Sequence, residues 1–130
     1  MITDCKFEIS NCQEMTPDEL RTRTKQFALR IIKLVGALPK NIEGGAIASQ
    51  LVRCGTSVAA NYRAACRARS RPEFVAKMGV VLEEADETQL WLELIIDAKL
   101  LSPKRVQPLL DEAANWLRSS SLRVNRLQQI

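Results

Sequence analysis

The sequence predicts an all-α protein, an antiparallel up-down-up-down four-helix bundle in one domain. Apolar residues recur at the three-to-four-residue spacing of helices along most of the chain, with no strand-like alternation. The chain of 130 residues contains only 5 Gly and 5 Pro, which disfavours a turn-rich β-sandwich. Four helices with short connections favour antiparallel neighbours. We expect residues 16–130 to form the bundle and residues 1–15, which show no clear period, to form a flexible N-terminal arm.

Proline and capping residues indicate where the helices begin and end. Thr16-Pro17-Asp18-Glu19 combines a capping hydroxyl, a proline in the first turn and a Glu three residues after the cap. The first helix should therefore run from about 17 to 38, before Pro39. Gly44-Gly45 interrupts the pattern, and a second helix should begin near there and end at about 68. Ser70-Arg71-Pro72-Glu73 forms a second capping box and Ser102-Pro103 a further start signal, which predict the third and fourth helices.

The composition argues against several classes of function. The chain has no His, which is the commonest metal ligand and general base. Its cysteines, Cys5, Cys12, Cys54 and Cys66, lack CxxC spacing, so we expect reduced thiols in a cytoplasmic protein. No apolar run approaches the roughly 18 residues of a membrane span, and the first residues do not have the pattern of a signal peptide. We expect no enzyme activity, catalytic residue, cofactor, metal, small-molecule substrate or membrane association.

Charge is unevenly distributed along the chain. The net charge is +4, but seven acidic and two basic residues give residues 72–101 a net charge of −5. The acidic helix can neutralise its basic neighbours within the fold or within an assembly. Its run Glu83, Glu84, Asp86 and Glu87 lacks the His and the facing carboxylates that di-metal bundles use.

The second helix carries a polar arc of about 80° beside its apolar arc. Such a stripe is either solvated or a buried seam satisfied by a neighbouring helix, and we favour the seam. We expect Arg53 to pair with Glu84 or Glu87 of the third helix, with Ser57 and Asn61 hydrogen-bonded nearby. The predicted interhelical polar seam comprises Gln50, Arg53, Ser57, Asn61, Glu84 and Glu87.

Two further faces predict a homo-oligomer. The second helix has a face of mostly small side chains, and Gly55 on it suggests a packing reason, because Gly inside a helix costs about 1 kcal/mol relative to Ala. The third helix has large apolar residues outside its main seam, which mark partner surfaces when exposed. In the alternative, Trp91 covers a groove of its own bundle. The expected oligomer interface consists of Ala48, Val52, Gly55, Ala59, Leu90, Trp91 and Leu94.

Four arginines, Arg63, Arg67, Arg69 and Arg71, cluster at the end of the second helix. They either complement the dipole at the helix C-terminus or contact the phosphates of a nucleic acid. No aromatic residue lies within the cluster, so RNA would be bound through its backbone with little reading of the bases.

Several motifs occur in order along the second and third helices. They are QLVRCGTSVAANYRAACRARS over residues 50–70, EFVAK over 73–77, EEADET over 83–88, and Trp91-Leu92. This order resembles the bacterial four-helix-bundle family of 23S rRNA intervening-sequence proteins, whose members typically read QLxRSGTSVGANYREAxRARS, FxxK, KExxET and YWL. The resemblance covers roughly residues 18–127. The chain departs from the pattern at Cys54, Ala64 and Glu83, and the last two alter the surface charge.

The resemblance implies a ring-like homopentamer without catalytic activity. A related bundle, the accessory protein of diversity-generating retroelements, is pentameric and basic and binds RNA and a reverse transcriptase. Two functions follow as hypotheses. The chain is a non-enzymatic oligomer that binds structured RNA through basic residues, or it is a protein-interaction adaptor, such as an accessory subunit of a reverse-transcriptase complex, without sequence readout of its own.

Overall fold

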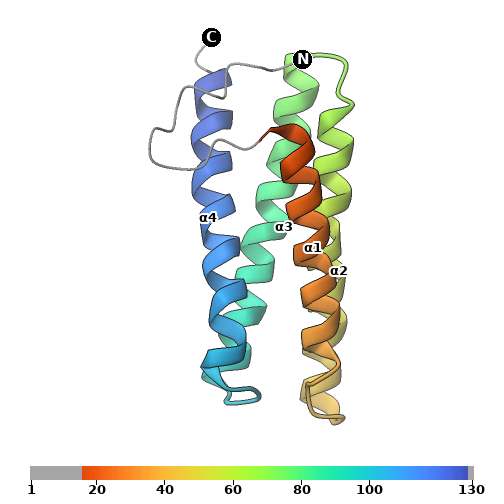
Figure 1. Ribbon diagram of the computed structural model, residues 1–130, viewed down its shortest axis with the longest axis vertical. Coiled ribbons are helices and arrows are strands. Elements are labelled where there is room, and N and C mark those ends of the chain that lie inside the picture. The colour runs from red at the N-terminus through yellow and green to blue at the C-terminus, as the bar shows by residue number, and fades with distance from the viewer. Residues whose placement is uncertain (1–15, 129–130) are drawn as a thin grey trace.

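The computed structural model describes residues 16–128, and side chains as far as residue 118. Four helices form an antiparallel bundle: α1 (Pro17–Val35), α2 (Ile42–Cys66), α3 (Arg71–Asp97) and α4 (Pro103–Gln128) (Figure 1). This confirms the all-α up-down prediction. The expected N-terminal arm, including Cys5 and Cys12, lies outside the described residues.

The start of α1 has the predicted capping box. The Thr16 side chain accepts a hydrogen bond from the Glu19 backbone N–H at 3.1 Å, and Glu19 Oε1 accepts one from the Thr16 N–H at 2.8 Å. The helix ends at Val35, three residues earlier than expected, and the chain continues in turns that still bury Leu38. The carboxylates of Asp18 and Glu19 in the first turn stabilise the helix, because they lie near the positive end of its dipole.

The start of α2 lies two residues before the glycine pair that marked it in the sequence. The side chain of Asn41 caps the helix by accepting a hydrogen bond from the Gly44 N–H at 2.8 Å. A Cβ on Gly44 would lie 2.1 Å from the carbonyl oxygen of Pro39. Gly44 is therefore required by the close approach of the backbone in this turn, and it does not break the helix.

The connections at both ends of α3 are short and locally bonded. Ser70 Oγ accepts from the Glu73 N–H at 3.1 Å, but Glu73 Oε1 accepts from the Arg69 N–H rather than from the cap residue itself. At the other end Lys99 adopts a left-handed conformation with φ of 58°, and the Leu100 N–H bonds to the Ile95 carbonyl at 3.0 Å. A positive φ at this position is usual for Gly and strained for Lys.

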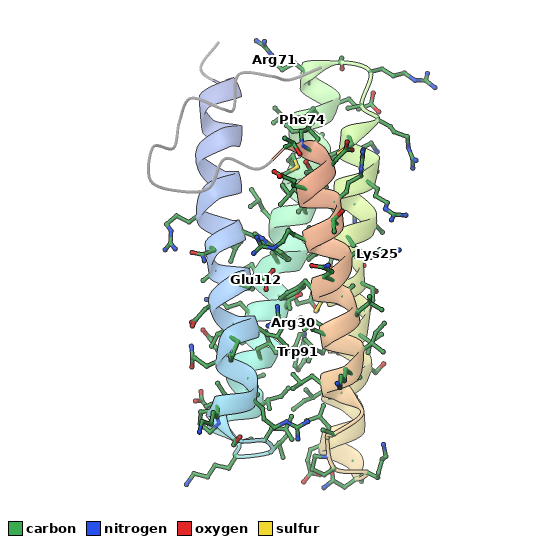
Figure 2. All side chains as sticks on the ribbon, in the orientation of Figure 1. Lys25, Arg30, Arg71, Phe74, Trp91 and Glu112 are labelled. Atoms are coloured by element: carbon green, nitrogen blue, oxygen red, sulfur yellow. The ribbon has the colours of Figure 1, made fainter. Side chains whose placement is uncertain are left out.

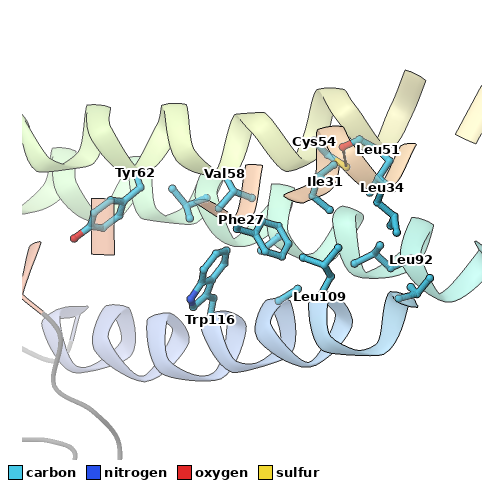
Figure 3. Packing of buried hydrophobic residues seen from close by; sticks show 14 of the residues in the cluster. Phe27, Ile31, Leu34, Leu51, Cys54, Val58, Tyr62, Leu92, Leu109 and Trp116 are labelled. Atoms are coloured by element: carbon cyan, nitrogen blue, oxygen red, sulfur yellow. Dashed lines mark hydrogen bonds between the residues drawn. The ribbon is translucent and has the colours of Figure 1, made fainter. Parts of the chain in front are cut away.

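The core follows the apolar faces that the sequence predicts. The largest fully buried side chains include Phe27, Ile31, Leu51, Leu92 and Val106, so every helix contributes (Figure 3). Each such side chain stabilises the fold by about 1.5–3 kcal/mol relative to its exposed state. Phe27 of α1 and Trp116 of α4 meet edge to face, with ring centroids 4.6 Å apart. No described helix is long and apolar enough to cross a membrane.

Gly55 allows α1 and α2 to pack closely within one chain. A Cβ on Gly55 would lie 3.0 Å from Ile31 Cγ2 and 3.1 Å from Ile31 Cγ1, and Ile31 is fully buried. Ala48, on the same face of α2, also packs against the core. The assignment of Gly55 to an oligomer interface was therefore wrong, because α1 already occupies this part of the α2 face.

Candidate functional site

The predicted contact between α2 and α3 forms around Arg53. Its guanidinium binds both carboxylates, Glu84 Oε1 at 3.3 Å from Nη1 and Glu87 Oε2 through Nη2. Arg53 Nε also donates to Gln50 Oε1 at 3.3 Å, and the indole N–H of Trp91 donates to Glu87 Oε2 at 3.2 Å. We call these five residues the Arg53 cluster; it joins successive turns of the two helices.

The Arg53 cluster is half-exposed in the single chain. The Arg53 side chain is 48% exposed, so water shares in its solvation and the expected burial is not reached. Hydrogen bonds from Arg53 and then from Trp91 lower the pKa of the Glu87 carboxyl. The hydrogen bond with Glu87 raises the pKa of Arg53 further. The cluster therefore links α3 to α2 at the surface, and its contacts favour the ionised forms of Glu87 and Arg53.

Of the remaining members of the predicted polar seam, Asn61 makes its hydrogen bond within its own helix. Asn61 Nδ2 donates to the Ser57 carbonyl at 2.9 Å, one turn earlier on α2. Thr88, which is fully buried, donates likewise to the Glu84 carbonyl at 2.7 Å. Next to it, burial raises the pKa of the Cys54 thiol, which packs as a small apolar group. Gln50, Arg53, Glu84 and Glu87 thus belong to the interhelical cluster. Asn61 and Thr88 instead bond to the backbone of their own helices.

A second ion-pair cluster, which the sequence reasoning missed, joins α1 to α4. Glu112 of α4 is only 12% exposed, and its carboxylate lies 2.6 Å from Arg30 Nη1 and 3.5 Å from Arg23 Nη2 (Figure 2). The signal was present on α4, because Glu112 lies three residues after Leu109 and four before Trp116, both of which are buried. A carboxylate beside an apolar stripe requires a cationic partner.

The four clustered arginines lie in the last turn of α2, in the connection that follows it and at the start of α3. Figure 2 shows Arg71 at this end of the bundle. All four are exposed, and none takes part in an ion pair between described residues. We call this set the arginine end. Its charge is therefore available to an external anion. Its members are Arg63, Arg67, Arg69 and Arg71.

The predicted oligomer interface is divided by the structure. Leu90 and Leu94 are exposed on α3, at 48% and 38%. Trp91 instead packs partly against the core of its own bundle, as the alternative for this residue foresaw. On α2, Val52 and Ala59 are half-buried. The α3 leucines thus remain available to a partner, whereas Gly55 and much of Trp91 do not.

The described residues meet the requirements of neither a metal site nor a disulfide. Within residues 16–128 no group of three or more His, Cys, Asp or Glu side chains is placed to hold a metal ion. The described cysteines, Cys54 and Cys66, are free thiols, the first of them buried. The surface of the described part of the chain presents the arginine end and the exposed leucines of α3.

Comparisons with known proteins place this geometry in a family. Residues 19–120 match the family model described as 23S rRNA-intervening sequence protein. A crystal structure of a protein with unknown function, from the S23 ribosomal protein family of Bacteroides thetaiotaomicron, is similar with a TM-score of 0.77 and 28% identity, covering 85% of this chain and 99% of that chain. No curated protein matches the chain. The matched residues include both the Arg53 cluster and the arginine end.

Proposed function

The chain belongs to the family of 23S rRNA-intervening sequence proteins, and on this premise we propose that it is a non-enzymatic, cytoplasmic homo-oligomer that binds structured RNA. The observation that carries the proposal is the arginine end. Four exposed guanidinium groups within nine residues lie at one end of a rigid bundle, without internal ion pairs among the described residues. Guanidinium groups contact phosphate oxygens bidentately.

The mode of binding follows from what surrounds these arginines. The cluster itself contains no aromatic side chain on which an unpaired base could stack. Arginines presented from a helix end and a short turn can reach phosphates along a folded RNA without entering its deep, narrow groove. The proposal is therefore backbone recognition with weak preference for sequence.

Assembly makes this binding effective. One chain has a net charge of only +4, but each copy in an oligomer adds another arginine end to the same particle. Contacts made by several copies to one RNA add as linked binding events, which raises the avidity without any new kind of contact. We favour a pentamer as the state of assembly.

The experiment is a salt titration of RNA binding with two variants of equal charge. The probe is a hairpin RNA, and log Kd is followed against log salt concentration. Replacing the arginine end with four Gln should weaken binding and reduce the slope by about 0.9 per lost phosphate contact. A matched control removes four exposed charges from the opposite end of the bundle, namely Lys40, Lys99, Lys104 and Arg105.

The control variant should bind RNA like the wild type. Equal weakening by both variants would mean that net charge, not the arginine end, attracts the RNA. Absence of binding by the wild type at low salt would overturn the proposal.

The exposed leucines of α3 favour a second candidate, a protein-interaction adaptor. Leu90 and Leu94 lie on the acidic helix, and an acidic apolar face suits a protein partner better than it suits RNA. An accessory subunit of a reverse-transcriptase complex would fit this surface. If the wild type does not bind RNA, this candidate becomes the better one.

A further inference from the structure

Two exposed helix faces each have apolar side chains flanked by charges, which are cationic on α1 and anionic on α3. On α1, Leu29 and Ile32 are 56% and 47% exposed, and Lys25 and Lys33 flank them along the helix. At 100° per residue these four side chains share an arc of about 100°. We call them the α1 face. An apolar pair flanked by cations is not explained by the packing of a single bundle.

The α3 face consists of Val80, Glu83, Leu90, Leu94 and Asp97, which also share an arc of about 100°. All five are exposed. Its leucines lie between two carboxylates, as the apolar pair of the α1 face lies between two lysines. None of these four flanking charges belongs to an ion pair between described residues.

We propose that the α1 face of one copy docks on the α3 face of a second copy, in a head-to-tail contact. This proposal rests on the assembly in the proposed function and names its interface. Like charges oppose the pairing of either face with itself, because Lys25 and Lys33 would meet lysines, and Glu83 and Asp97 would meet carboxylates. Pairing the two different faces instead covers the exposed apolar side chains and brings opposite charges together.

The proposed contact also explains the uneven charge of the chain. Of the acidic residues on α3, Glu84 and Glu87 bind Arg53 within the bundle, but four others, Glu83, Asp86, Glu93 and Asp97, stay exposed. Neutralisation within the fold is thus incomplete, and a neighbouring copy would supply the remaining cations. A contact between two different faces repeats from copy to copy, and it forms a ring when the rotation closes.

The test is a mixing experiment with one variant for each face, Leu29→Asp and Leu94→Asp. Both side chains are exposed, so both variants should keep the wild-type circular dichroism. Each variant retains one intact face, and each alone should give a mass near the 14.6 kDa of one chain by light scattering. An equimolar mixture should form a 1:1 dimer, because the intact α3 face of the first variant meets the intact α1 face of the second. Ile42→Asp, at an 89% exposed position outside both faces, is the control and should assemble like the wild type.

The outcomes separate this proposal from the more general one. If either single variant still assembles, or if the mixture stays monomeric, the pairing of α1 with α3 is wrong while assembly itself stands. A wild type that is monomeric at micromolar concentration would overturn both proposals. A mixture that forms dimers from two monomeric variants is expected only for a contact between two different faces.

Discussion

Replacing Gly55 with alanine should change the free energy of unfolding in two opposite ways, through a gain in helix propensity and through crowding against Ile31. Alanine should stabilise the helix by about 1 kcal/mol, because it restricts the unfolded chain and has the best helix propensity. Its Cβ, however, would lie 3.0–3.3 Å from three atoms of Ile31, which is fully buried, so Ile31 would have to shift by a few tenths of an ångström within the core. Overpacking of this kind costs about 1–3 kcal/mol. We therefore expect a net loss of about 1 kcal/mol in the free energy of unfolding.

Gly79 provides the matched control, because a Cβ at this position meets no atom within 4 Å. Gly79→Ala on α3 should stabilise the protein by about 1 kcal/mol through helix propensity alone. The two variants should therefore differ by about 2 kcal/mol in urea denaturation. Protein concentration must be held constant, since assembly adds to the apparent stability by mass action.

The same pair of residues offers a check on the mechanism. Ile31→Ala removes the two γ carbons that crowd the new Cβ, so in that background Gly55→Ala should stabilise the protein instead. A coupling free energy of about 1–2 kcal/mol between positions 31 and 55 is expected. Equal stabilisation by Gly55→Ala and Gly79→Ala in the wild-type background would refute the close packing of α1 on α2.

Three further changes test other parts of the structure. Lys99→Gly should raise the free energy of unfolding by about 1 kcal/mol, as measured by urea denaturation, because Gly adopts the left-handed conformation with φ of 58° without strain. Glu112→Gln should lower it by about 1–2 kcal/mol, since the hydrogen bond from Arg30 loses its anionic acceptor and the ion pair with Arg23 is lost. The pKa of Glu87 is lower in the folded state than in the unfolded state. Its contribution to stability is therefore fully present at pH values above the unfolded-state pKa, and it is lost as the pH falls through the folded-state pKa. Glu87→Gln should therefore flatten the decline in stability below about pH 4.5, as followed by thermal unfolding at successive pH values; an unchanged pH profile would contradict the role of Arg53.

The sequence predicted the helices well where local chemistry decides them. The capping box of Thr16 and Glu19 acts through neighbouring residues, and the structure reproduces it atom by atom. The start of α2 was placed two residues late, because Gly44 looked like a helix breaker. Its true role, a close approach to the Pro39 carbonyl, depends on the path of the turn and not on composition.

Of the contacts between helices, the sequence predicted one ion-pair cluster and missed the other. The Arg53 cluster could be expected, because both of its sides lie beside apolar arcs on neighbouring helices. Gly55 was assigned to a partner molecule, since periodicity shows that a face is small but not which neighbour covers it. Glu112 was missed because its partners, Arg23 and Arg30, lie on α1 at the far end of the sequence, and helix rotation about the bundle axis is set by packing as a whole.

The most direct test of the central claim is the mass of the wild-type protein, measured by light scattering with and without a hairpin RNA. We predict a mass that is a multiple of 14.6 kDa at micromolar concentration, and a heavier particle containing both components when the RNA is added at low salt. The heavier particle should disappear at high salt while the protein oligomer remains, because phosphate contacts are screened and apolar contacts are not. A mass of one chain under all conditions, with the RNA eluting separately, would contradict the account.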